Sequence, residues 1–441
     1  MRLKKVIIDN FRIIDNCEIE FDSQFNLIIG NNGTGKTSIL EGIRVGLGGF
    51  IAGFQEVTTT KFNKEDIRMI SELTGDGSYD IKYMTPTKVH CTIVTNEDND
   101  IDWERALTSY KSSRTTSPKN ISNYAHELIN NSNSILPILS YQSAGRMWSQ
   151  KREKWQDVFK GSFSRSVGYT DCLATESNIK MLTNWCKRMD YVSYQQNKEI
   201  MEYEVVKKAV GKFISILEKK SLDSIISYDK RREELIYSTG EEIIPVRLLS
   251  TGYRSIIGMI ADIAYRMAVL NPNLGIEIIE KTNGIILIDE IDMHIHPKWQ
   301  WTIVDALIKT FPSVQFIATT HSPIIISSCK DKRIIRLFDK DDSTSKVEMG
   351  AMSEISPYGW QINDVLNKFM YVDEREPTLK DKLYKIEELT NKKFKKNINS
   401  VEDRELDILK SELYDRLPEN DAAIELIELQ SIENILRMRG K

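Results

Sequence analysis

The chain has 441 residues, and its 60 Lys and Arg against 64 Asp and Glu give a formal net charge of −4. This balance excludes a general attraction to nucleic acid, so any DNA contact would need a local basic patch. Because no apolar run approaches about 20 residues and no leader pattern opens the chain, we expect a cytoplasmic protein without a membrane domain. Five cysteines without a C-x-x-C pair predict reduced thiols and no structural zinc site.

The N-terminal segment alternates between apolar and polar side chains from Leu3 to Phe21. A period of two is typical of strands that have one buried face. The segment therefore predicts two short antiparallel strands, joined around Asp9–Arg12, that shelter the first strand of a central sheet.

A glycine-rich loop follows the apolar segment Phe25–Ile29. The loop, Gly30–Thr37, fits the G-x-x-x-x-G-K-[ST] template at every fixed position. Such a loop points successive N–H groups at a triphosphate, at the positive end of a helix that we expect to begin near Lys36. Lys36 offers a charge for the β- and γ-phosphates, and the Thr37 hydroxyl a ligand for Mg²⁺. The residues predicted to bind ATP here are Asn31, Asn32, Gly33, Thr34, Gly35, Lys36, Thr37 and Ser38.

Residues 47–102 are polar and rich in turns, with predicted strands at Ile81–Met84 and His90–Thr95. We interpret this stretch as a β-rich elaboration of the nucleotide-binding lobe. The apolar run Ile135–Tyr141 then predicts another core strand, and Gln142 follows it directly.

From Gly145 to about Lys230 the pattern becomes helical, basic and aromatic, with Trp148, Trp155 and Trp185 among its bulky residues. At helical spacing such residues favour packing between helices over stacking on nucleic acid bases. The segment lacks the long heptad arms and the central C-x-x-C of SMC-type machines. We therefore expect a compact helical insertion.

Three later motifs complete a nucleotide site. Ser250, Thr251 and Gly252 precede an amphipathic helix, Ser255 to Leu270, where their backbone and hydroxyl groups can hold a γ-phosphate. The buried strand Gly284–Ile288 ends in two acids: Asp289 is predicted to hold Mg²⁺, and Glu290 to polarise the attacking water. The strand Val314–Thr320 ends at His321, which we expect beside the same nucleotide because parallel strands share a ligand-binding edge.

The C-terminal part is predicted to be helical after a last strand at Lys332–Phe338 and a charged turn at Asp339–Ser345. Its apolar residues form three stripes: Leu379, Leu383, Ile386 and Leu389; Leu406, Leu409, Leu413 and Leu417; and the run from Ile424 to Leu436. Such stripes are buried against another surface, either the core of this chain or a partner.

The hexapeptide Leu249–Arg254 resembles the signature motif of ABC ATPases, with Tyr253 where transporters usually carry Gln. The ordered set of motifs, including Asp292–Gln300 and Thr319–Pro323, is similar to the RecF/OLD-type AAA ATPases, which are ABC ATPases. The opening segment up to Phe21 resembles those of RecF- and SMC-like ATPases. This likeness implies that ATP lies between two subunits, that the signature acts in trans, and that Asp292–Pro297 lies at the subunit interface. It also implies that Gln142 contacts Mg²⁺ and the attacking water.

Three further segments, Gln142–Trp148, Gly168–Cys172 and Tyr358–Ile362, are similar to PtuA-type ATPases of the Septu anti-phage system and of related retrons. That resemblance implies a separately encoded HNH nuclease of the PtuB kind as effector. The alternative is an AriA-like ATPase of the PARIS type, which works with a Toprim nuclease. OLD-type proteins carry Toprim on the same chain, but this tail offers no strand-borne Glu followed by D-x-D.

The expected fold is α/β: an ABC/RecF-like P-loop ATPase with a mixed β-sheet core, a helical insertion and a C-terminal α-helical module. We expect an ATPase lobe over residues 1–145, the insertion over 146–230, a second ATPase lobe over 231–345, and the helical module over 346–441. The predicted function is a dimeric or larger switch ATPase with ATP and Mg²⁺, which either hydrolyses ATP or senses it. The rivals are a RecF-like DNA-repair clamp and a transporter ATPase, the latter disfavoured by the insertion and the tail.

Overall fold

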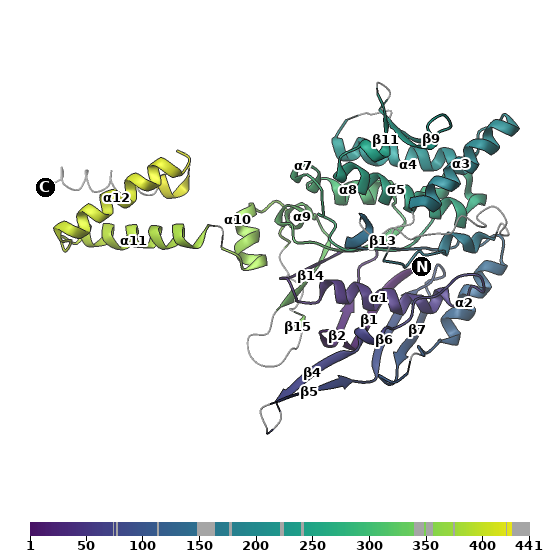
Figure 1. The fold of residues 1–441 in the computed structure, drawn as a ribbon, viewed down its shortest axis with the longest axis horizontal. Coiled ribbons are helices and arrows are strands. Elements are labelled where there is room, and N and C mark those ends of the chain that lie inside the picture. The colour runs from purple at the N-terminus through teal and green to yellow at the C-terminus, as the bar shows by residue number, and fades with distance from the viewer. Residues whose placement is uncertain are drawn as a thin grey trace. The chain divides into compact units, whose positions relative to one another are not determined.

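The computed structural model describes residues 1–73, 75, 78–112, 114–147, 164–175, 179–220, 225–239, 242–338, 348–349, 356–373, 375–419 and 421–425 (Figure 1). The chain divides into two compact units, Met1–Ile362 and Asn363–Lys441. We describe each unit by itself. The four-part division expected from the sequence stays a prediction.

A six-stranded sheet forms the centre of the first unit, in the order β15-β14-β3-β13-β12-β8. The strands from β14 to β8 run parallel, and β15 is antiparallel to β14. Every residue of β3, β8, β12 and β13 is buried, which explains their continuous apolar sequences. The predicted core strands are therefore confirmed, with bounds β3 (Phe25–Ile29), β8 (Ile138–Gln142), β12 (Gly284–Ile288), β13 (Val314–Thr319) and β14 (Arg333–Phe338). The strand β15 (Glu348–Met349) was not predicted, since the sequence was expected to be helical from residue 346.

The strand β8 begins three residues later than the sequence predicts. It starts immediately after Pro137, which lacks the N–H that a ladder hydrogen bond requires. Its last residue is Gln142, so this side chain belongs to the strand end and not to the following loop.

A second, antiparallel sheet has the order β2-β1-β6-β7. The predicted N-terminal pair is confirmed, since β1 and β2 are paired from Lys5–Glu20 to Phe11–Ile14. Its strands are β1 (Arg2–Phe11), β2 (Ile14–Glu20), β6 (Thr87–Val94) and β7 (Asp100–Leu107).

The helix α1 (Lys36–Ile51) follows the glycine-rich loop and contacts strands of both sheets. All of its residues except Thr37 are buried. The packing is close: a Cβ on Gly46 would lie 2.4 Å from Sγ of Cys91. This helix is therefore held between two layers, which fixes the position of the loop that precedes it.

A hairpin that the sequence only half predicts projects from the body as a two-stranded ribbon, β4 (Arg68–Leu73) and β5 (Tyr79–Met84) (Figure 1). The pairs Met69–Tyr83, Ser71–Ile81 and Leu73–Tyr79 share one face of the ribbon. The five apolar side chains on that face are all exposed.

Helices and a small sheet complete the first unit. The sheet has the order β11-β10-β9, with β9 (Ile225–Asp229), β10 (Glu234–Ser238) and β11 (Ile243–Pro245). The helices are α2 (Lys119–Asn130), α3 (Ile179–Gln196), α4 (Met201–Glu218), α5 (Thr251–Leu270), α6 (Ile278–Lys281), α7 (Pro297–Gln300), α8 (Ile303–Thr310) and α9 (Pro323–Ser328), and α10 (Ile362–Val365) crosses the unit boundary. Short turns of this unit are η1 (Lys64–Asp66), η2 (Ala144–Met147), η3 (Arg165–Tyr169), η4 (Val246–Leu248) and η5 (Pro272–Glu277), and the π-turn η6 (Leu366–Met370) belongs to the second unit.

The predicted helical insertion is confirmed over α3 and α4, but the prediction is wrong at its end. Residues 225–229 form a strand because this β-branched and aromatic stretch pairs with β10. Trp185 packs edge-on against Tyr203 and Tyr265, at centroid distances of 5.9 and 5.1 Å, as packing between helices predicts. Trp148 and Trp155 lie outside the described residues.

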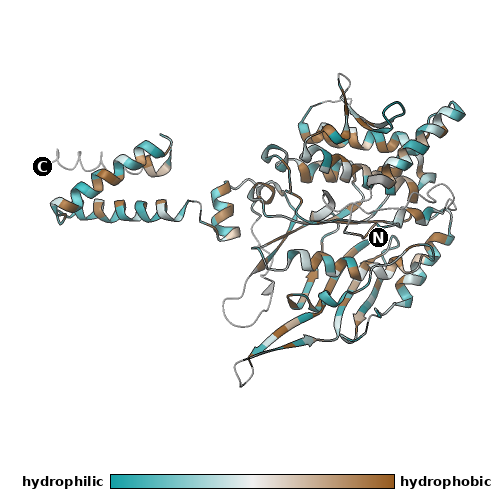
Figure 2. Ribbon diagram, in the orientation of Figure 1, coloured by the Kyte–Doolittle hydropathy of each residue, from teal (hydrophilic) through white to brown (hydrophobic). Residues whose placement is uncertain are grey.

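In the second unit, α11 (Pro377–Phe394) and α12 (Ser400–Arg416) pack against each other. Figure 2 shows hydrophobic residues recurring along both helices. The buried cluster comprises Ile386, Leu389, Leu406, Leu413 and Ile424, and the partly buried residues around it are Leu379, Leu383, Ile398, Leu409 and Leu417. The first two predicted stripes therefore cover each other. The third, Ile424–Leu436, is described only as far as Glu425.

The five cysteines are all buried and free, as predicted. Burial raises the pKa of each thiol to about 12. None of the described helices is long and apolar enough to cross a membrane.

The second unit should unfold more easily when its core is truncated. Leu406→Ala removes a side chain that is 1% exposed, and we expect it to destabilise this unit by about 2–5 kcal/mol. Ile408→Ala is the matched control, because Ile408 is 67% exposed on the same helix. Calorimetric unfolding of the full chain measures both. Equal stability of the two variants would contradict the assigned core.

Candidate nucleotide site

The glycine-rich loop has the backbone that a phosphate-binding loop needs. Gly33 and Gly35 have φ values of 85° and 99°, and Gly35 is the N-cap of α1. A residue with a side chain is strained in this left-handed region. Glycine adopts it without strain, which lets successive N–H groups turn inward. The Nζ of Lys36 donates to the carbonyls of Gly30 and Asn31, at 2.8 and 2.7 Å. Its ammonium group therefore lies across the loop in which the phosphates are predicted to bind.

The Asp289 carboxylate lies beside the P-loop helix, at the end of β12. The Thr37 hydroxyl donates to its two oxygens, Oδ1 at 3.2 Å and Oδ2 at 3.1 Å. Asp289 is 3% exposed, so its charge needs such partners. The structure brings together two of the three predicted Mg²⁺ ligands, Thr37 and Asp289, and their hard oxygens fit that ion. Among the described residues, no group of three or more His, Cys, Asp or Glu side chains could hold a metal by itself.

Glu290 follows Asp289 with a left-handed backbone, at φ 48°. Its N–H donates to the Thr319 hydroxyl over 2.8 Å. Its side chain is half-buried, so water can reach it. The predicted catalytic carboxylate is thus at the same strand edge as Asp289.

His321 follows β13, which lies between β12 and β3 in the sheet. Its N–H donates to Oδ1 of Asp292 over 3.3 Å. Burial, then the charge of Lys36, lowers the pKa of His321 against the opposing effect of Asp292, Glu290 and Asp289. A lowered pKa favours the neutral imidazole, whose ring carries one N–H.

The Gln142 side chain is turned toward another element. Its backbone carbonyl accepts from the Asp289 N–H over 2.9 Å, which places the residue at the site. Its Nε2, however, donates to Ser140 Oγ at 2.9 Å and to Asp262 Oδ2 at 3.1 Å. Its role as a metal ligand stays a prediction and would require this amide to reorient.

The partner of Gln142 was not found from the sequence. Asp262 lies on α5 and also accepts from Nε of Arg266 at 3.0 Å. Arg266 in turn donates to the carbonyls of Gly168 and Thr170. The only sequence signal was an acid–base pair four residues apart in an otherwise apolar helix.

Ser250 lies at the N-terminus of α5, as predicted, but this helix begins at Thr251 and not at Ser255, so Thr251 and Gly252 belong to its first turn. Ser250 is the N-cap, and its hydroxyl accepts from the Tyr253 N–H at 3.4 Å. A Cβ on Gly252 would lie 2.6 Å from the carbonyl oxygen of His294. The ring of Tyr253 packs edge-on against Trp299 at 4.6 Å, and its hydroxyl donates to Glu218. The signature and the Asp292–Pro297 stretch are therefore neighbours within one chain.

The sequence profile of a family described as AAA domain matches residues 5–242, more than half of the chain. The chain belongs to this family of ATPases. Membership confirms the α/β P-loop fold and the enzyme class that the motifs predict.

Known proteins add detail to this AAA family assignment. The probable ATPase of retron Vc95 from Vibrio cholerae serotype O1 biovar El Tor is 28% identical over 424 residues, covering 83% of this chain and 78% of that protein. The Septu protein PtuA of Bacillus thuringiensis is 25% identical over 394 residues, covering 84% of this chain and 85% of that protein. An SMC head bound to the C-winged helix domain of ScpA has a TM-score of 0.50 at 13% identity, covering 80% of this chain and 98% of that chain. This last likeness shows the fold, that of an ABC ATPase head.

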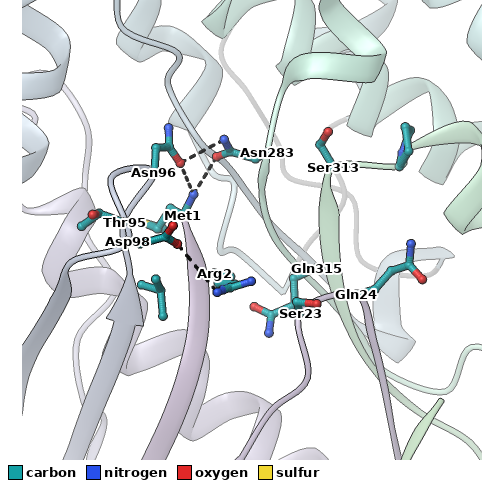
Figure 3. Close-up of a pocket in the computed structure, with 12 residues that line it drawn as sticks. Met1, Arg2, Ser23, Gln24, Thr95, Asn96, Asp98, Asn283, Ser313 and Gln315 are labelled. Atoms are coloured by element: carbon teal, nitrogen blue, oxygen red, sulfur yellow. Dashed lines mark hydrogen bonds and ion pairs between the residues drawn. The ribbon is translucent and has the colours of Figure 1, made fainter. Parts of the chain in front are cut away.

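A separate polar cavity of about 340 Å³ lies at the N-terminal ends of the parallel strands of the six-stranded sheet, whereas the nucleotide site lies at their carboxyl ends (Figure 3). Gln24, Asn283 and Ser313 line it, and each of them precedes a parallel strand of the core. The Met1 amine donates to Asn96 and Asn283 there, and burial lowers its pKa to about 5. Since the phosphate-binding residues lie at the carboxyl ends of these strands, this cavity is not the nucleotide site.

Replacing Gly252 should disturb the signature without emptying the P-loop. In Gly252→Ala the new methyl meets a backbone oxygen that cannot rotate away, so the tip or the Asp292–Pro297 stretch must shift. A displacement of about 1 Å can cost about 10²-fold in rate. We expect such a loss in ATP hydrolysis with retained nucleotide binding, and Gly75→Ala is the control because no atom of the described residues lies within 4 Å of its Cβ position. Wild-type hydrolysis by Gly252→Ala would contradict the close contact.

Proposed function

We propose that this chain is the switch ATPase of a prokaryotic anti-phage defence system, acting in the cytoplasm. It binds ATP and Mg²⁺ between two copies of itself and controls a separately encoded nuclease, for which an HNH enzyme of the PtuB kind is favoured. The observation that carries the proposal is the convergence of Thr37, Asp289, Glu290 and His321 on one edge of a parallel sheet.

Each residue at this edge has a distinct role in phosphoryl transfer to water. The P-loop N–H groups and Lys36 hold the phosphates, and Thr37 and Asp289 would hold Mg²⁺. A bound Mg²⁺ would neutralise charge on the phosphate oxygens. Glu290 accepts the proton of the attacking water, while the neutral His321 donates to the γ-phosphate.

The exposed end of the signature supports a site shared between copies. Ser250 is exposed, and Gly252 is packed against the backbone of His294. The signature and the Asp292–Pro297 stretch can therefore meet a second chain together. The two halves of each site then come from different copies. ATP bound in a complete site therefore indicates that two copies have associated.

The relatives support the defence role. A retron ATPase and a Septu PtuA each match more than three quarters of both chains. Between Asn363 and Glu425, the described residues form helices and turns and no strand, so they offer no Toprim sheet. The nuclease is therefore proposed to be a separate protein that responds to the nucleotide state.

Glu290→Gln should keep ATP bound while hydrolysis falls by about 10²–10⁴-fold, because an amide cannot accept the proton. Single-turnover hydrolysis of labelled ATP measures this change, and Glu56→Gln, at an exposed position, is the control. Hydrolysis at the wild-type rate would remove Glu290 from the mechanism.

The same variant tests the effector. Glu290→Gln keeps the chain in its ATP-bound state. The amount of an HNH nuclease encoded by an adjacent gene that co-purifies with the variant should therefore differ from the amount that co-purifies with the wild type. A Toprim gene product in its place would favour the PARIS-type alternative. Tight DNA binding that falls steeply with salt would instead favour the repair clamp.

A site completed in trans predicts recovery on mixing. Lys36→Ala removes the phosphate-binding charge, and Ser250→Arg blocks the signature, so each variant alone should be inactive. At equal mixing half of the dimers combine both variants and hold one intact site, so about a quarter of the wild-type sites should return. Activity of the mixture measures this. No recovery from folded, associating chains would refute the shared site.

A further inference from the structure

Thr319 contacts both acids of the site, and the motif that it opens, Thr319–Pro323, assigned it no role. It is the last residue of β13 and is 0% exposed. The register pairs Ile288 of β12 with Ala318 of β13. The next residues along these parallel strands, Asp289 and Thr319, therefore lie side by side.

One hydroxyl makes two hydrogen bonds there. The Oγ1 of Thr319 donates to Asp289 Oδ1 over 2.7 Å and accepts from the Glu290 N–H over 2.8 Å. A hydroxyl has one proton and two lone pairs, so both bonds form at once. The same atom thus restrains the side chain of Asp289 and the backbone of Glu290.

The Asp289 carboxylate is consequently held from two sides. Thr37 donates to it from the P-loop helix, and Thr319 donates from the neighbouring strand. Thr37 contacts both oxygens at 3.1–3.2 Å, whereas Thr319 contacts only Oδ1, at the shorter distance of 2.7 Å. Thr37 contacts the two oxygens at nearly equal distances and so does not distinguish them. The Thr319 bond to Oδ1 does, and it therefore sets the rotation of the carboxylate.

We propose that Thr319 is a positioning residue for ATP hydrolysis, which orients the metal-holding oxygen of Asp289 and the backbone that carries Glu290. The inference rests on the proposed roles of these two acids. The Thr319 side chain is 0% exposed, so it acts through Asp289 and Glu290. Its loss would remove the short bond to Asp289 Oδ1 and leave the Glu290 N–H without this acceptor.

The next residue has a different role. The Thr320 hydroxyl donates to Asp292 Oδ1 over 2.5 Å, and the His321 N–H donates to the same oxygen. Thr320 is therefore tied to the Asp292–Pro297 stretch, whereas Thr319 is tied to the metal and base residues. A variant at position 319 therefore tests the connection to Asp289 and Glu290 and leaves the Thr320–Asp292 bond in place.

The test compares Thr319→Val, Thr319→Ser and Thr310→Val. Valine keeps the shape of threonine and removes the hydroxyl, while serine keeps the hydroxyl. Thr310 is a matched control, since its buried hydroxyl has no hydrogen-bond partner among the described residues. Groups that orient metal ligands typically contribute 10–100-fold to metal affinity or activity.

We expect Thr319→Val to lower single-turnover hydrolysis about 10- to 100-fold and to raise the half-saturating Mg²⁺ concentration by a similar factor. The affinity for metal-free ATP should be unchanged, because the P-loop is intact. Thr319→Ser should restore both quantities, and Thr310→Val should leave both unchanged. Mn²⁺ paramagnetic resonance with ATP supplies a readout that does not depend on turnover.

Three results would overturn the proposal: an unchanged metal requirement in Thr319→Val, equal defects in the valine and serine variants, or an equal defect in Thr310→Val. If Thr319→Val does not fold, Thr319→Ala replaces it in the Mn²⁺ experiment. Failure of the proposed function gives a different result, a wild-type chain that hydrolyses no ATP. The Mn²⁺ comparison still tests Thr319 in that case.

Discussion

The site depends on the buried carboxylate of Asp289. Two hydroxyls, from Thr37 and Thr319, donate to it, and its own N–H donates to the carbonyl of Gln142. These bonds join the ends of β8, β12 and β13 to the helix that follows β3. Because a buried charge is costly without partners, the strand order and register around Asp289 are tied to the stability of the site. A slip of one residue would turn this carboxylate to the other face of the sheet.

The contact between Gly252 and His294 constrains the exposed part of the molecule in a similar way. The signature tip cannot move far relative to the Asp292–Pro297 stretch, because backbone meets backbone with no side chain to adjust. The pair Tyr253 and Trp299 reinforces this contact. Transporters usually carry Gln where this signature has Tyr253. Packing explains the tyrosine, since its side chain fills the space between α4, α5 and α7.

Local patterns revealed most of the fold, because each core strand is a short apolar run and each motif occupies a few consecutive residues. The contacts that join distant segments were not visible. Thr319 and Asp289 are thirty residues apart, and their meeting follows from β13 lying beside β12, which no pattern within either strand encodes. The direction of the Gln142 amide likewise depends on Asp262 of α5. Of the hairpin, only the strand β4 was missed, because its apolar side chains are exposed and mark no core.

The buried cysteines give the chain an unusual chemical property. With thiol pKa values of about 12, only about one thiol in 10⁴ is ionised at pH 8, and each is also covered by the protein. The folded chain is therefore nearly silent toward maleimides and other alkylating reagents. A single cysteine introduced at an exposed position beside the signature, such as Leu248, would be the reactive thiol of the folded protein. Labelling chemistry can then follow the association of two copies without first removing a native cysteine.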